Sequence, residues 1–187
     1  MPARRLCIAA AAVLIALLQP FPAGAQSRVP PGLVTQHGAA FTDRNLAGAP
    51  FAIFFGFTSC PDICPTTLMD LTSDLAALGA AAEKLSVVFV SVDPERDTPE
   101  RLKEYMGSFD PRIVALSGPA DAIAALARAF GAKYRKVPTQ SGYTIDHTAA
   151  VFLVDRDGET AAVIDAAEPQ PQRLAKLREL LQARPAK

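Results

Sequence analysis

An apolar run at residues 51–57 ends abruptly in a loop that holds Cys60 and Cys64. Seven residues are too few for a helix, and the Phe and Ile content is typical of a strand buried on both faces of a parallel sheet. After the loop, leucines recur at helical spacing, at Leu68, Leu71, Leu75 and Leu78. The cysteines therefore lie where a central strand gives way to a helix, at the sheet edge where α/β folds place their chemistry.

Strand and helix patterns alternate along the rest of the chain. Strands are expected at 85–92, 113–116, 148–154 and 160–164, the last two joined by a hairpin turn at 155–158. Helices are expected between these strands, with an acid-and-proline start at 97–100, and at the carboxyl end. The order predicts a thioredoxin-like α/β fold over residues 41–187, with a central mixed sheet flanked by helices. That fold keeps its thiols at the end of the first central strand.

The first 25 residues have the pattern of an export signal. Arg4 and Arg5 precede thirteen uncharged residues at 6–18, and residues 23–25 form a small-x-small cleavage motif. A helix that spans a bilayer needs about 17 or more apolar residues, so we expect cleavage and an exported, periplasmic protein. The alternative is that residues 6–18 are retained as a tether to the inner membrane.

Charge and cysteine count narrow the function of the exported chain. Loss of residues 1–25 leaves 17 basic and 19 acidic side chains without a basic tract, which argues against a nucleic-acid partner. Cys7 leaves with the signal, so Cys60 and Cys64 are the remaining pair. A structural disulfide across so short a loop would remove little chain entropy. A reactive or metal-binding pair is the preferred interpretation.

Residues 26–40 are punctuated by proline and glycine without periodicity, and we interpret them as a linker or tether. His37 lies in this segment. A lone histidine in a linker is usually solvated, so we do not expect it to bind metal.

The thioredoxin-like order also predicts what faces the thiols. Redox enzymes of this fold place a cis-proline just before the strand that opens the closing hairpin, whereas this chain has His147 there. Two thiolates and an imidazole form a soft set of three ligands that suits trigonal Cu(I), and imidazole also suits Cu(II). A structural zinc site would need a fourth ligand. Asp146 either orients the imidazole or caps the loop, while Met69 and Met106 are expected to fill core or surface.

Four segments together resemble the Sco (SCO1/SenC) family of copper chaperones. They are FGFTSCPDICPTTL at 55–68, SVDPERDTPERLKEY at 91–105, FDPRIVALSG at 109–118 and YTIDHTAAVFLVDRDG at 143–158. The resemblance implies that Cys60, Cys64 and His147 bind copper, received from an upstream donor. It further implies delivery to the binuclear CuA centre of cytochrome c oxidase subunit II during oxidase assembly.

Two other functions and one loop stay open at this stage. The cysteine pair would also serve a thiol–disulfide oxidoreductase that keeps the oxidase cysteines reduced, or a copper or redox sensor. A chaperone is not an enzyme, although it would allow accessory reductase activity, and copper binding requires the reduced dithiol. The acidic loop at 93–97 is either a hydrated, internally paired helix cap or a docking rim beside the metal.

Overall fold

The structure is a computed structural model and describes residues 29–183. In chain order the elements are β1 (Val34–Thr35), η1 (Asp43–Asn45), β2 (Phe51–Gly56), α1 (Ile63–Leu78), η2 (Gly79–Lys84), β3 (Ser86–Ser91), α2 (Pro99–Met106), β4 (Ile113–Ser117), α3 (Ala120–Ala129), β5 (Tyr134–Thr139), β6 (Gly142–His147), β7 (Ala150–Val154), β8 (Thr160–Asp165) and α4 (Gln170–Gln182).

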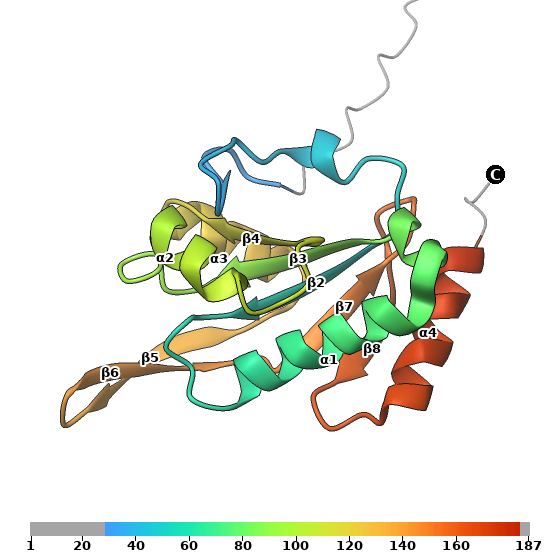
Figure 1. Cartoon of the computed structure of the whole chain (residues 1–187). Helices are drawn as coiled ribbons and strands as arrows, with labels where there is room; N and C mark the ends of the chain where they lie inside the picture. Colours follow the sequence, from blue (N-terminus) through green and yellow to red (C-terminus); the bar gives the residue numbers. More distant parts are fainter. Residues whose placement is uncertain (1–28, 184–187) are drawn as a thin grey trace, which may run out of the picture.

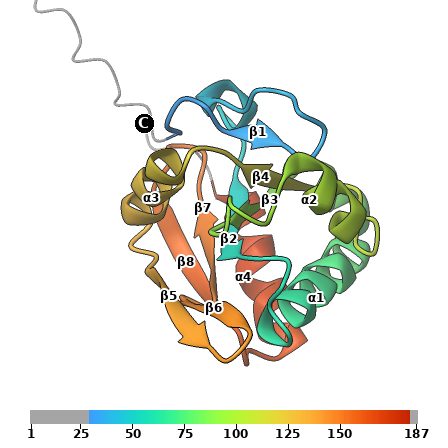
Figure 2. The ribbon, with the colours of Figure 1, turned by 90° about the vertical axis from the view of Figure 1, so that its left-hand side faces the viewer.

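A six-stranded mixed sheet forms the centre of the domain, in the order β1-β4-β3-β2-β7-β8 (Figure 1). Strands β2, β3 and β4 are parallel, whereas β7 pairs antiparallel with β2, and β8 with β7. Helices α1 and α4 pack together on one face and α3 lies on the other (Figure 2). The predicted thioredoxin-like α/β fold is confirmed, and the strands predicted at 51–57, 85–92 and 148–154 share this sheet.

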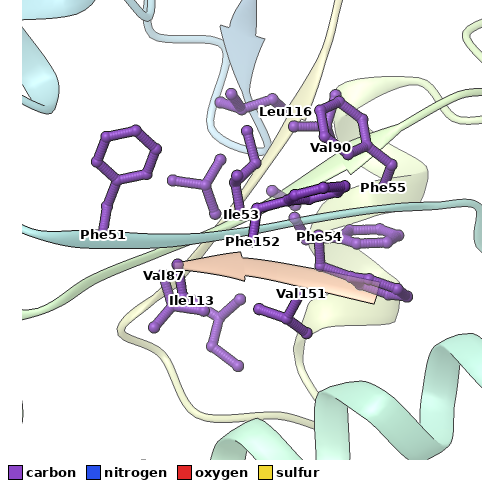
Figure 3. Packing of buried hydrophobic residues seen from close by; sticks show 14 of the residues in the cluster. Phe51, Ile53, Phe54, Phe55, Val87, Val90, Ile113, Leu116, Val151 and Phe152 are labelled. Carbon is purple, nitrogen blue, oxygen red and sulfur yellow. The ribbon is translucent and has the colours of Figure 1, made fainter. Parts of the chain in front are cut away.

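Side chains of β2 alternate between the two halves of the core. Ile53 and Phe55 point to the side of α3, where Phe55 lies 6.1 Å from Phe130 between ring centroids (Figure 3). Phe54 points to the side of α1 and stacks on Phe89 at 5.7 Å. Every residue of β2 is buried. This is why the run reads as continuously apolar rather than alternating.

The prediction that residues 26–40 form a linker or tether is wrong for residues 29–40, which the structure describes. β1 lies within it and pairs antiparallel with β4 at the edge of the sheet. Leu33 is only 1% exposed, and the buried Gln36 amide accepts a hydrogen bond from the Ala115 N–H at 2.8 Å. A two-residue strand and scattered apolar contacts have no periodicity, so the sequence pattern could not reveal this packing.

The predicted signal peptide at 1–25 lies outside the described residues. Within residues 29–183, no helix combines the length and apolar character that crossing a membrane requires.

The sequence also failed to predict the β5–β6 hairpin. Among residues 29–183 its strands pair only with each other and form a separate two-stranded sheet, and Pro138 lies within β5. The hairpin projects beyond the main sheet (Figure 1). As a result the strand predicted from residue 148 begins at Ala150, and His147 is the last residue of β6.

Truncation of Leu33 tests whether residues 29–40 belong to the domain. We expect Leu33→Ala to lower the free energy of unfolding by about 2–5 kcal/mol, because it opens a cavity in the core. Urea unfolding measures this change, with His37→Ala as the control because His37 is exposed in the same segment. Equal free energies of unfolding for the two variants would show that Leu33 does not stabilise the domain and that the segment is a linker.

Candidate metal centre

The cysteine loop connects the central strand β2 to α1. Cys64 is the second residue of α1 and has no exposed surface, whereas Cys60 lies in the loop and is partly exposed. Both thiols are free. Cys64 therefore faces the core, and Cys60 is the more accessible sulfur.

Gly56 makes room for the buried thiol. A Cβ atom at this position would lie 2.7 Å from the Cys64 Sγ and 2.8 Å from the ring of Phe89, distances that real Cβ atoms do not tolerate. Gly56 was not predicted from the sequence to have a role at the site. The available signal was a glycine that closes a strand of otherwise bulky residues, which is typical of a close approach by another group.

His147 brings an imidazole to the thiols from the end of β6. Its Nε2 lies 3.4 Å from the Cys64 Sγ, and its Nδ1 lies 3.2 Å from the Thr148 carbonyl oxygen. A carbonyl oxygen only accepts, so we assign the proton to Nδ1, which leaves the Nε2 lone pair facing the sulfur. The ring meets Phe54 and Phe57 edge to face, at 6.2 and 5.8 Å.

The donor atoms of Cys60, Cys64 and His147 all lie within 4.8 Å of one another. In the part of the chain that the structure describes, this is the group of Cys, His and acidic residues that could hold a metal ion. The structure thus joins residues 87 positions apart, as expected from the fold. Two sulfurs and one imidazole nitrogen form a soft donor set that favours Cu(I) over hard cations.

Burial affects the protonation of Cys64 and His147. Desolvation raises the pKa of the Cys64 thiol, so without a cation that thiol stays protonated at neutral pH. Desolvation also lowers the pKa of His147, so its imidazole is neutral at pH 7. A metal ion would supply the positive charge that the site lacks and displace the thiol protons.

The acidic loop at 93–97 supports both ligand-bearing segments. Asp97 has no exposed surface, and its carboxylate accepts hydrogen bonds from the Thr58 N–H at 2.9 Å and the Thr58 hydroxyl at 2.6 Å. Asp93 is equally buried and accepts from the hydroxyl of Tyr143, on β6, at 2.8 Å. The loop is internally paired, since Arg96 forms an ion pair with Asp93, as the prediction of a hydrated, internally paired helix cap required. The part of that prediction that is wrong is the hydration, because Asp93 and Asp97 are buried.

Asp146, Met69 and Met106, the three other residues considered near the metal, do not join this cluster. The Asp146 carboxylate binds the guanidinium of Arg135 at 2.9 Å, and both side chains are mostly exposed, so it does not contact the imidazole. Met106 is buried in the core, and Met69 is 54% exposed on α1. The predicted core and surface roles of the two methionines are confirmed.

Comparison with known protein families gives a consistent match. The SCO1/SenC family model matches residues 25–182. SCO2-like protein RP587 of Rickettsia prowazekii is 40% identical over 129 residues, covering 67% of this chain and 63% of that protein. Mitochondrial SCO2 of Saccharomyces cerevisiae is 34% identical over 158 residues, covering 82% of this chain and 52% of that protein. The chain thus aligns with less than two thirds of the length of these relatives.

Solved structures show the same similarity. Copper-bound ScoI of Bradyrhizobium japonicum is 43% identical, with a TM-score of 0.74, over 81% of this chain and 97% of that one. Copper-bound yeast Sco1 is 30% identical, also with a TM-score of 0.74, over 83% of this chain and 88% of that one.

Alkylation rates test the difference between the two thiols. In the reduced protein we expect iodoacetamide to modify Cys60 well before Cys64, because Cys64 is buried and its pKa is raised. Peptide mass spectrometry over time measures both rates. In denaturant the two rates should converge, and equal rates in the folded protein would contradict the geometry described.

Proposed function

This chain belongs to the SCO1/SenC family, and on that premise we propose that it is a copper chaperone. The observation that carries the proposal is the convergence of Cys60, Cys64 and His147, the soft donors that copper prefers. Two similar proteins, from Bradyrhizobium japonicum and yeast, have been solved with copper bound. One copper ion per chain is expected, held by two thiolates and one imidazole.

The position of the ligands suits a protein that releases its ion. Cys60 and His147 are partly exposed and belong to a loop and a hairpin rather than to the main sheet. A hollow of about 360 Å³ opens at the end of the hairpin where His147 lies, lined by Lys133, Tyr134, Arg135, Asp146, His147 and Thr148. Ligands of an acceptor can therefore reach copper from the side of Cys60 and His147 while Cys64 still holds it.

The proposed acceptor is the binuclear CuA centre of cytochrome c oxidase subunit II, and an upstream donor supplies the ion. Binding requires both thiols reduced, and each thiol that binds as thiolate releases its proton. The neutral imidazole of His147 needs no deprotonation. We place this work in the periplasm, with residues 1–25 as the export signal or, if uncleaved, with residues 6–18 as a membrane tether.

Removal of the imidazole tests the copper site. We expect His147→Ala to weaken copper affinity by more than the 10–100-fold typical of changes around a ligand, because a ligand itself is lost. Chelator competition measures the affinity, and His37→Ala is the control. Delivery to a CuA-site acceptor should be abolished in His147→Ala and retained in the control.

A thiol–disulfide oxidoreductase is the second candidate function. It is favoured by one observation, namely that the two sulfurs lie within 4.8 Å of each other and are free. His147→Ala leaves the dithiol intact and should spare disulfide exchange, whereas Cys60→Ser and Cys64→Ser should abolish both activities. If His147→Ala binds and delivers copper as well as the wild type, the dithiol is the whole site and the oxidoreductase function replaces the chaperone function.

A further inference from the structure

The hairpin that carries His147 is not part of the main sheet. In the part of the chain that the structure describes, β5 and β6 pair only with each other, and an isolated two-stranded hairpin is marginally stable in water. Its position over the cysteines therefore depends on side-chain contacts with the body of the domain. Alternation along β6 puts Tyr143, Ile145 and His147 on one face of the strand, and Ile145 is buried.

Tyr143 has four contacts with the loop at 93–97. Its hydroxyl lies 2.8 Å from Asp93 Oδ1, to which it donates, and 3.4 Å from the exposed Glu95 Oε2, and the Arg96 guanidinium donates to the Tyr143 carbonyl oxygen at 3.1 Å. The same guanidinium lies 4.0 Å from the centre of the Tyr143 ring, a cation–π contact. Arg96 also forms an ion pair with Asp93, so the carboxylate, the guanidinium and the phenol close on one another.

Burial makes these contacts costly to lose. Asp93 has no exposed surface, so its carboxylate depends on Arg96 and Tyr143 to replace the water it gave up. By contrast, Glu95 and Lys136 join the same loop and hairpin by an ion pair at 2.6 Å, with side chains 67% and 46% exposed. Exposed ion pairs of this kind contribute little to the stability of the folded state.

We infer that Tyr143 and Arg96 are positioning residues, which latch the β5–β6 hairpin to Asp93 and thereby set the distance between His147 and the cysteines. The opposite end of the loop fixes the cysteine segment, because Asp97 binds Thr58, two residues before Cys60. Through its two buried carboxylates, this one loop thus determines the separation of the two segments that converge on the site. The latch itself does not depend on the proposed function; only the identity of the ion as copper rests on it.

Tyr143→Phe tests the latch, because it deletes the hydroxyl and keeps the ring. In the metal-free protein we expect amide hydrogen exchange at residues 143–147 to accelerate about tenfold or more, since a hydrogen bond to a charged group is lost. Exchange in β2 and β3 should be unchanged. Copper affinity, measured by chelator competition, should fall about 10–100-fold, as for other changes that misplace a ligand.

Glu95→Gln is the matched control, because it removes the charge of the exposed ion pair with Lys136 but keeps an acceptor oxygen for the Tyr143 hydroxyl. We expect wild-type exchange and copper affinity in this variant. Arg96→Gln should loosen the hairpin as Tyr143→Phe does. Arg96→Gln also leaves the buried Asp93 carboxylate without its cation and can therefore destabilise the whole domain. Global unfolding is monitored in parallel, and the conclusion is drawn from Tyr143→Phe.

Three results would overturn the latch. They are wild-type exchange at 143–147 in Tyr143→Phe, equal loosening in Glu95→Gln, and a loosened hairpin with unchanged copper affinity. Failure of the proposed function looks different. A wild-type protein that takes up no copper would refute the chaperone, while exchange in the metal-free protein would still decide whether the hairpin is latched.

Discussion

Two buried carboxylates hold the candidate site together. Asp93 and Asp97 stand at the two ends of one loop after β3, and neither has exposed surface. A buried carboxylate must recover the hydrogen bonds that water provided, so each one constrains its partners strongly. Asp97 constrains Thr58 in the cysteine loop and Asp93 constrains Tyr143 in the hairpin. The two segments that converge on the site are thereby anchored to the same loop.

The sheet supplies the frame for this loop. β2 and β3 are adjacent parallel strands, so the cysteine loop and the acidic loop leave the sheet at the same edge. β2 is buried on both faces and paired on both sides, so the cysteine loop starts from a central, well-supported strand. Gly56 then lets the Cys64 sulfur lie directly against the strand. The rigid half of the site is therefore the half that carries the sulfurs.

The other half is built differently. His147 ends a hairpin outside the main sheet, and its ring is held by aromatic edges, by Cys64 and by the Thr148 carbonyl. A buried sulfur at the start of α1, packed against a central strand, and an imidazole on a small hairpin form an asymmetric site. Such a site can keep an ion on one side while the other side opens, which is what the proposed transfer to an acceptor requires.

Local sequence pattern alone determined the strand at 51–57, the cysteine loop, the helix that follows this loop, and the α/β class. Each of these depends on the spacing of apolar residues within one short stretch, and that spacing is written directly in the chain. Resemblance to a family, together with the order of elements, pointed to His147. Only the tertiary structure showed the β5–β6 hairpin, the packing of Leu33 and β1, the role of Gly56, and the burial of Asp93 and Asp97. These depend on contacts such as that between Tyr143 and Asp93, fifty residues apart. A side chain's burial is decided by what the folded chain places around it, and local periodicity carries no record of that.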